Sequence, residues 1–438
     1  MIREPRSKGT CPQPRQLFIP ICLRELEPSV AKIIAFIAGR DPLSELSGGH
    51  SSYVRAHARA AAYAGYAPHI FCVAPHSEVT ETGFGVIHRI ASTVRPFRQL
   101  TVMGHARSIA AEVERFLRDW PRPDLIHSFG AWGYAGILAA NRLRLQGRCC
   151  VTVLGSYTTY TDEFRSKVDS LSSSHGLLTG LRYNSELLWA RLLVEGFEKQ
   201  AYLKSDVVTV NYESVTRLIR ARYGQSVNIV KLPYTSESAF LAEIFAGQSS
   251  PPIPQEPPSG GDDTLSIVTI ARQEPNKGIH ILLAAFEELR RAGIKFSACI
   301  IGGGPLLESH RRLARRLRLN DVVTMVGAVP DVSPYLQRAN VYVLPSLGEG
   351  SGSLALIEAI QSGLAVVATR VDGIVEDVTD GENALLVNPG SPQELCAAIS
   401  KLGMDPSLRL RLGTAARQRF VDKFSAEAFS KSLGKLYS

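Results

Sequence analysis

The sequence predicts an α/β protein made of two doubly wound domains that face each other across a cleft. Short β-branched runs alternate with longer amphipathic stretches, which is the pattern of a parallel sheet covered by helices. A proline- and glycine-rich break, GQSSPPIPQEPPSGGDD at 247–263, divides this alternation into two halves of comparable size. The 438 residues also exceed what one ordinary core holds. Ligands of such domains bind at the carboxyl ends of the strands.

The first half begins after a proline-rich stretch without apolar period, so we expect an extension at 1–30 and a domain over 31–245. Its expected strands are Lys32–Ala38, His69–Val73, Asp124–His127, Cys149–Leu154, Val207–Asn211 and Asn228–Leu232. Its expected helices are Ser52–Ala64, His105–Trp120, Gly133–Leu145 and Ser214–Tyr223. The segment Asp162–Lys204 interrupts the alternation: it starts with polar SKVDSLSSSHG and is strongly helical from Leu181 to Tyr202.

The second half restarts the alternation after a linker at 246–263, and we expect its domain over 264–438. The expected strands are Leu265–Ile270, Ser297–Ile301, Val322–Val326, Asn340–Leu344, Ala365–Thr369 and Ala384–Val387. The expected helices are Ile279–Ala292, Pro305–Leu319, Val332–Arg338, Ser353–Gln361, Pro392–Leu402, Leu408–Lys423 and Ala426–Leu436. We expect the last of these to pack back on the first domain.

The composition is that of a soluble globular protein with a basic balance. Hydrophobic residues make up 45% and charged residues 21%, and the net charge is +8. The densest basic cluster, His310–Arg318, carries leucines at helical spacing. A solvated helix face is the favoured interpretation, an anionic membrane contact comes second and nucleic acid last, so no nucleic-acid partner is expected.

The cysteines indicate a reducing compartment rather than a metal site. There are seven, with no CxxC and no zinc spacing, and no signal peptide is recognised. No apolar run reaches the length of about 18 residues that spans a membrane. We therefore expect a cytoplasmic protein without a bound metal, with peripheral contact at the inner face of the membrane left open.

A loop between two strands of the second half predicts an anion site. Residues 345–370 read PSLGEGSGSLALIEAIQSGLAVVATR, in which a Gly/Ser turn enters an apolar helix. Such a turn aims backbone N–H groups at a bound phosphate. Glu349 on the loop and Glu358 in the second turn of the helix face one pocket as acceptors for hydroxyl groups. The alternative is that Glu358 is a surface helix residue.

Three other turns follow strands in the same way. ARQEPNKG at 271–278 places Arg272 and Lys277 beside a helix start, where a guanidinium fork and an ammonium suit a diphosphate. IGGGP at 301–305 and GGHSS at 48–52 allow close backbone approach to a ligand. A surface loop is the alternative for the first, and a plain glycine turn for the other two.

These motifs together resemble a known family. The second half is similar to retaining glycosyltransferases of family 4, the glycogen-synthase and sucrose-synthase-like group. The resemblance rests on VTIARQEPNKG (268–278), CIIGGGP (299–305), VTMVGAVPDV (323–332), ANVYVLPSLGEGSGSLALIEAIQSGLAVVAT (339–369) and DGENALLVNPGSPQELCAAI (380–399). The first half resembles the family's acceptor domain more weakly, through SGGHSSYVRAHARAAAYAGYAPHIF, DLIHSFG, CVTVLGS and DVVTVNYESVTRLIRARYG.

The resemblance implies the GT-B fold, with two Rossmann-like domains, and transfer of a sugar from a nucleotide-diphosphate-sugar to a hydroxyl acceptor with retention of configuration. The acceptor is a glycan, a lipid-linked molecule or a small molecule. No cofactor and no metal are implied. The implied catalytic residues are Glu349, Arg272 and Lys277. The implied donor-binding residues are Gly48, Gly49, Arg272, Lys277, Gly303, Val326, Gly352, Ser353, Leu354 and Glu358. His50, His127 and Ser156 are candidates for the sugar or acceptor side.

The chain departs from the family pattern in three places. Eight residues separate Glu349 from Glu358 where the family has seven, and Phe129 and Leu154 stand where the family often has histidine. Front-face attack and double displacement both remain open as routes to retention. Two other functions stay open: a catalytically silent relative that binds a nucleotide or a partner protein, and a nucleotide-sugar epimerase.

Overall fold

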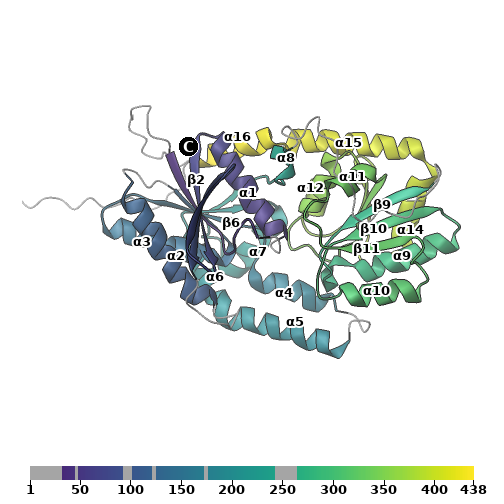
Figure 1. The fold of residues 1–438 in the computed structure, drawn as a ribbon, viewed down its shortest axis with the longest axis horizontal. Coiled ribbons are helices and arrows are strands. Elements are labelled where there is room, and N and C mark those ends of the chain that lie inside the picture. Colours follow the sequence, from purple (N-terminus) through teal and green to yellow (C-terminus); the bar gives the residue numbers. More distant parts are fainter. Residues whose placement is uncertain (1–31, 45–47, 92–100, 121–124, 172–175, 242–263) are drawn as a thin grey trace, which may run out of the picture.

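The computed structural model contains two β-sheets, one from each half of the sequence (Figure 1). It describes residues 32–44, 48–91, 101–120, 125–171, 176–241 and 264–438. The expected extension at 1–30 lies outside these residues, as does the linker at 246–263. Each described sheet is flanked by helices, and the prediction of two doubly wound α/β domains is confirmed.

The first sheet has the strand order β3-β4-β2-β1-β5-β6-β7-β8. Within the described residues its pairs are parallel except β3–β4. Alternate residues of β1 enter different cores: Ile34 and Phe36 pack on one face, and Ile33, Ala35 and Ile37 on the other. The strands are β1 (Lys32–Ile37), β2 (Tyr66–Ala74), β3 (Glu78–Thr82), β4 (Gly85–Ala91), β5 (Leu125–Phe129), β6 (Val151–Ser156), β7 (Val207–Val210) and β8 (Ile229–Lys231).

The β3–β4 hairpin was not predicted. Its first strand reads EVTET and is largely exposed, so it lacks the apolar run used to find the other strands. Arg89 on β4 donates to Asp41 at 2.6 Å and to Thr80 at 2.6 Å. These bonds hold the hairpin against the carboxyl end of β1.

The helices of the first half include a long arm built by residues 160–171 and 176–204. Thr159 caps α4 by accepting a hydrogen bond from the Asp162 N–H at 3.2 Å, so part of the polar run after Asp162 is helical. From α5 the chain continues through a π-helical stretch, Ala190–Val194, into α6. The helices are α1 (Gly48–Tyr63), α2 (Thr101–Arg118), α3 (Gly133–Leu145), α4 (Tyr160–Asp169), α5 (Leu177–Trp189), α6 (Glu195–Lys204), α7 (Glu213–Tyr223) and α8 (Ser238–Leu241).

The second sheet has the order β11-β10-β9-β12-β13-β14, with parallel pairs throughout its described strands. The strands are β9 (Leu265–Ile270), β10 (Phe296–Ile301), β11 (Val323–Gly327), β12 (Val341–Leu344), β13 (Ala365–Thr369) and β14 (Leu385–Val387). The helices are α9 (Ile279–Arg291), α10 (Leu307–Arg316), α11 (Ser333–Arg338), α12 (Leu354–Gln361), α13 (Ile374–Asp377), α14 (Pro392–Met404), α15 (Pro406–Phe424) and α16 (Ala426–Tyr437). No helix in the described part of the chain is long and apolar enough to cross a membrane.

The last helix returns to the first half of the molecule. α15 and α16 run along one side of both sheets, and α16 ends beside β2 and α1 (Figure 1). The Tyr66 hydroxyl donates to the Tyr437 carbonyl at 2.9 Å. Phe429 and Leu433 of α16 are fully buried in a core that also contains Ile34 and Phe36. One hydrophobic core therefore runs through both halves.

A buried carboxylate also joins the halves. Asp377 of α13 accepts a hydrogen bond from the Tyr212 hydroxyl of the first half and lies 3.3 Å from Lys423 of α15. Beside it, Glu376 accepts from the Glu213 N–H at 2.9 Å and pairs with Lys231 at 2.6 Å. These contacts orient the two sheets with respect to each other.

Candidate active site

The candidate site lies where strands of the second sheet end and helices begin. After β9 the chain makes a short 3-10 helix, Pro275–Lys277, and enters α9 through Gly278. Gly278 has a φ of 64°, and a Cβ there would lie 2.0 Å from the Pro345 carbonyl oxygen. Only glycine fits this left-handed position, which brings the turn after β9 against the loop after β12.

Arg272 lies at this edge with two carboxylates around it. Its guanidinium is 3.4 Å from Glu163 of α4 and 3.6 Å from Glu274. Burial alone would raise the pKa of Glu163, but Lys167 and Arg272 lower it to about 2. The Arg272 side chain remains 55% exposed, so its fork is open to a further anionic partner.

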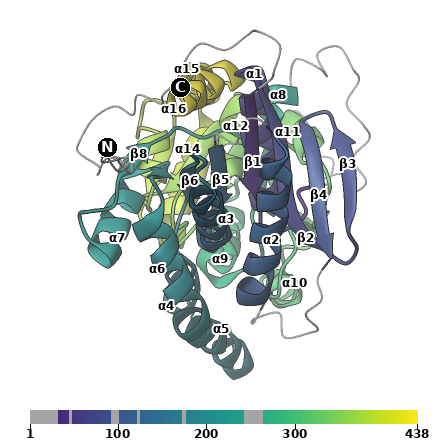
Figure 2. The same cartoon turned by 90° about the vertical axis from the view of Figure 1, so that its left-hand side faces the viewer.

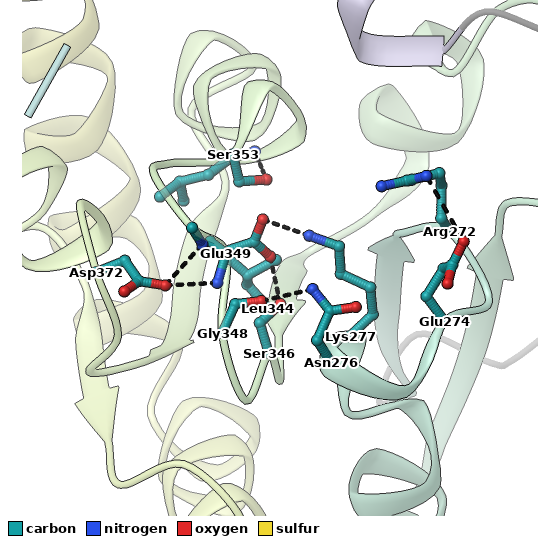
Figure 3. Close-up of polar contacts among 12 residues, drawn as sticks. Arg272, Glu274, Asn276, Lys277, Leu344, Ser346, Gly348, Glu349, Ser353 and Asp372 are labelled. Carbon is teal, nitrogen blue, oxygen red and sulfur yellow. Dashed lines mark hydrogen bonds and ion pairs between the residues drawn. The ribbon is translucent and has the colours of Figure 1, made fainter. Parts of the chain in front are cut away.

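Lys277 points from the same turn toward the loop of Glu349 (Figure 3). Its ammonium lies 2.5 Å from a Glu349 carboxylate oxygen, and the two side chains are only 13% and 5% exposed. The other Glu349 oxygen accepts a hydrogen bond from the Ser346 hydroxyl. Lys277 and Glu349 therefore form a largely buried ion pair.

Asp372 holds the loop in this position. Its carboxylate accepts from the backbone N–H groups of Glu349 and Gly350 at 2.6 and 2.8 Å (Figure 3). On the other side, the Asn276 side chain donates to the Gly348 carbonyl at 2.9 Å. Gly350, within the stretch lengthened by one residue, has a φ of 74°. A left-handed glycine thus accompanies the extra residue while Glu349 stays beside Lys277.

The loop ends at the N-terminus of α12. Ser353 caps the helix by accepting from the Leu356 N–H at 3.3 Å, and the first helical N–H groups have no intrahelical acceptor. A Cβ at Gly352 would lie 1.8 Å from the Tyr212 hydroxyl oxygen of the first half. The close approach of the two halves at this helix start therefore requires glycine.

Glu358 lies in the second turn of α12 and is half-buried. Burial, followed by the nearby charges of Asp331 and Glu237, raises the pKa of its carboxyl to about 7. A carboxyl with such a pKa changes its charge within the neutral range, which surface helix glutamates do not do.

The first half presents the start of α1 to this site. A Cβ at Gly49 would lie 3.4 Å from Leu354 Cδ1, so the glycine turn of the first half meets the start of α12. The next residue, His50, has its Nδ1 3.0 Å from the Tyr157 hydroxyl oxygen. Burial, and then the charge of Arg40, lower the pKa of His50 to about 4, which leaves it neutral at physiological pH.

Four predicted residues have other surroundings. His127 is completely buried, and its Nδ1 is 2.6 Å from the Tyr437 hydroxyl oxygen. Ser156 is completely buried as well, with its hydroxyl 2.5 Å from that of Tyr202. Neither side chain is exposed in this structure, and the expected role of both on the sugar or acceptor side stays a prediction. Gly303 accepts through its carbonyl from the Gln273 N–H at 2.9 Å beside Arg272, while Val326 is half-buried in β11.

Residues 255–419 match the family described as Glycosyl transferases group 1, and residues 48–235 match the Glycosyl transferase 4-like domain. The chain belongs to this glycosyltransferase family. It is 31% identical over 180 residues to a putative colanic acid biosynthesis glycosyltransferase, WcaL, of Salmonella typhimurium, covering 39% of this chain and 44% of that protein.

A second relative of this chain is the GDP-mannose-dependent alpha-(1-6)-phosphatidylinositol monomannoside mannosyltransferase of Mycolicibacterium smegmatis. The two are 28% identical over 246 residues, which cover 53% of this chain and 62% of the relative. The chain thus spans about half the length of the curated relatives it matches.

Solved structures show that the chain has the GT-B fold. A sucrose-phosphate synthase from Thermosynechococcus elongatus aligns with a TM-score of 0.71 at 23% identity, covering 93% of this chain and 98% of that one. Anabaena HepE in complex with UDP and glucose aligns with a TM-score of 0.62 at 17% identity, covering 93% and 99%.

The sequence did not point to the first-half residues that reach the turn after β9. Lys167 of α4 is 5% exposed and lies 3.2 Å from Glu163 and 3.9 Å from Glu274. The Tyr183 hydroxyl of α5 donates to Glu274 at 2.7 Å. The interruption of the alternation at 162–204 was the only indication in the sequence, because no local pattern tells which half a helical arm contacts.

The described residues contain no cluster of side chains that could form a metal centre. Among them, no group of three or more His, Cys, Asp or Glu side chains is arranged to hold an ion. The positive charges at the site are instead those of Arg272 and Lys277.

Proposed function

We propose that the protein transfers a sugar from a nucleotide-diphosphate-sugar to an acceptor hydroxyl, with retention of anomeric configuration, in glycan, polysaccharide or glycoconjugate biosynthesis. One observation carries the proposal: Arg272 and Lys277 follow β9 and lie at the edge where α12 begins. A guanidinium, an ammonium and a helix N-terminus at one edge favour a diphosphate. The names of relatives, which mention UDP and GDP-mannose, agree with such a donor.

Donor binding requires an exchange of partners at both cations. The diphosphate would replace Glu163 or Glu274 at Arg272, and would share Lys277 with Glu349. The N–H groups around Gly352 to Leu354 would bind the distal phosphate, and ionised Glu358 would accept from the ribose hydroxyls. Gly48, Gly49, Gly303 and Val326 complete the proposed donor contacts through their backbone.

The reaction breaks the bond between the anomeric carbon and the diphosphate oxygen and forms a bond to the acceptor oxygen on the same face of the sugar. In front-face attack, the acceptor proton passes to the leaving phosphate oxygen. Arg272 and Lys277 would stabilise the charge that develops on the diphosphate, without a metal or cofactor. Double displacement needs a free carboxylate nucleophile. Both oxygens of Glu349 are engaged by Lys277 and Ser346, which favours the front-face route.

The acceptor would bind against the first half, beside the neutral imidazole of His50 and the Tyr157 hydroxyl. A neutral imidazole accepts and donates hydrogen bonds without attracting anions. It therefore suits an uncharged hydroxyl of a glycan, a lipid-linked sugar or a small molecule.

A second function is favoured by the pairing of both cations. A silent relative would bind a nucleotide or a partner protein without turnover, and its charges would be neutralised internally, as those of Arg272 and Lys277 are here. An epimerase is the third candidate.

One experiment distinguishes the three candidate functions. UDP- and GDP-sugars are incubated with the protein and with cell extract as the acceptor pool, and the products are identified by mass spectrometry and NMR. Transfer gives a nucleoside diphosphate and a glycoside of unchanged anomeric configuration, epimerisation gives an isomeric donor, and a silent relative gives neither.

The diphosphate assignment has its own test. Arg272→Ala should weaken binding of the matching nucleoside diphosphate by about 1.5–3 kcal/mol, the range of hydrogen bonds to charged groups. Arg291→Ala, which removes a guanidinium that is 72% exposed on α9, is the matched control and should leave affinity unchanged. Equal affinity of the Arg272 variant and the parent would refute the assignment.

A further inference from the structure

Helix α5 exposes leucines that the proposed reaction does not use. Leu177, Leu178, Leu181 and Leu188 are 80%, 82%, 59% and 57% exposed, and Leu192 in the following π-helical stretch is 71% exposed. The opposite side of α5 is buried through Tyr183 and Leu187. The helix is therefore held on the body of the protein by one face while the other displays apolar side chains.

The exposed leucines form a stripe. Positions 177, 181, 188 and 192 are spaced by four, seven and four residues, so they recur on one face of a helix. Exposed Asn184 and Ser185 lie between Leu181 and Leu188, so the stripe has two apolar parts. Isolated exposed leucines are ordinary on protein surfaces, but several on one helix face mark a candidate interaction site.

Basic side chains accompany the stripe. Arg182 and Arg191 of the same segment are exposed. On α10, Arg312, Arg315 and Arg316 are exposed. α5 and α10 both lie on the lower side of the molecule in Figures 1 and 2, where α5 projects furthest. This side, defined by the α5 leucines and the α10 arginines, combines apolar and positively charged surface.

We propose that this side docks on the surface of an anionic lipid membrane. Leucines of an interfacial helix enter the boundary between headgroups and acyl chains, while arginines beside them meet lipid phosphates. A second copy of the chain fits less well, because it would bring the same arginines against each other on a protein whose net charge is already +8. The positive charge of this side therefore favours an anionic lipid surface over a second copy of the chain as the binding partner.

Docking in this orientation would place the lipid surface close to the candidate active site. Tyr183, on the buried side of α5, donates to Glu274, and Glu274 lies 3.6 Å from Arg272. The membrane proposal concerns a binding surface and does not depend on the chemistry of transfer. Its test therefore contains neither donor nor acceptor.

The test is flotation of the protein with vesicles of phosphatidylcholine, with and without about one third phosphatidylglycerol. The parent should bind the anionic vesicles, and bind the neutral ones more weakly. Leu181→Ser/Leu192→Ser should lower partitioning by about 100-fold, since each leucine kept out of lipid reduces it by about tenfold. Leu410→Ser is the matched control: Leu410 is 73% exposed on α15, on the upper side in Figure 1.

Charge is tested separately. Arg312→Glu/Arg316→Glu should weaken binding to anionic vesicles by about tenfold or more and reduce its salt dependence, while Lys431→Glu on α16 should not. Nucleotide affinity and melting temperature equal to those of the parent show that each variant is folded. Failure of the parent to bind anionic vesicles would overturn the proposal. An equal loss of vesicle binding in Leu410→Ser would also overturn it. So would sedimentation showing that the parent is a dimer and that the leucine variants are monomers.

Discussion

Single substitutions in the Lys277–Glu349 ion pair should both lower thermal stability, but they should differ in their effect on nucleotide binding. The two groups are 2.5 Å apart with side-chain exposures of 13% and 5%, so each would be left charged and largely buried if its partner were removed. The cost of such a loss is about 3–5 kcal/mol, against at most about 1 kcal/mol for an exposed pair. For a domain of this size that corresponds to a fall in melting temperature of roughly 6–20 °C.

Glu349→Gln and Lys277→Met should therefore both lower the melting temperature strongly. The double variant Lys277→Met/Glu349→Gln should regain most of the loss, because it leaves no unpaired charge. Their effects on a nucleoside diphosphate should differ. Lys277→Met removes a contact worth about 1.5–3 kcal/mol, whereas Glu349→Gln releases the ammonium from its competitor and should bind at least as tightly as the parent.

The assays are thermal melting by circular dichroism and calorimetric titration with UDP and GDP. Glu287→Gln, which breaks the exposed Arg291–Glu287 pair at 2.6 Å, is the control and should change neither readout. Two results would refute the reasoning. One is a melting temperature of Glu349→Gln indistinguishable from that of the control, and the other is nucleotide binding weakened equally by Glu349→Gln and Lys277→Met.

Two more predictions concern α12. The folded pKa of Glu358 is about 7 against an ordinary value of 4.5, so the folded state binds the extra proton and its stability falls as pH rises from about 4.5 to 7. Glu358→Gln should remove this slope, with a gain on the order of 3 kcal/mol above pH 7. It should also abolish a rise in nucleotide affinity as pH rises through about 7, where Glu358 of the folded protein ionises; a stability slope that persists in the variant contradicts the assignment. Gly352→Ala should lower the melting temperature and turnover, because its Cβ would meet the Tyr212 hydroxyl, whereas Gly196→Ala, with open space around it, should not. Comparable melting of the two alanine variants would show that the halves do not close on Gly352.

Much of the second half could be predicted from the sequence, because its polar candidate residues follow directly after strands that the apolar pattern predicts. Several apolar β-branched runs are followed by a turn that carries a candidate site residue, as Arg272 follows β9. The polar β3 strand had no such run and was missed. Asp372 was not among the predicted site residues, because only the folded chain brings this loop carboxylate to the N–H groups of Glu349 and Gly350.

His127 and Glu163 show a second reason why sequence reasoning fails. A histidine near the end of a strand can face either a cleft or a core. The hydrogen-bond partner of His127 in the core is Tyr437, which lies 310 residues away in the sequence. Glu163 lies in a polar helix that looks solvated, yet it meets Arg272 from the other half. In both cases the deciding partner is distant in the chain, so neither periodicity nor motif spacing contains the information.

The return of α16 to the first half has a consequence for the order in which the protein folds. The core around Ile34 and Phe36 includes Phe429 and Leu433, and buried His127 finds its partner in Tyr437. During synthesis, the first half therefore emerges from the ribosome long before the residues that complete its interior. Until then the apolar side chains that Phe429 and Leu433 cover have no partner, so we expect this half to complete its folding only after α16 has been translated.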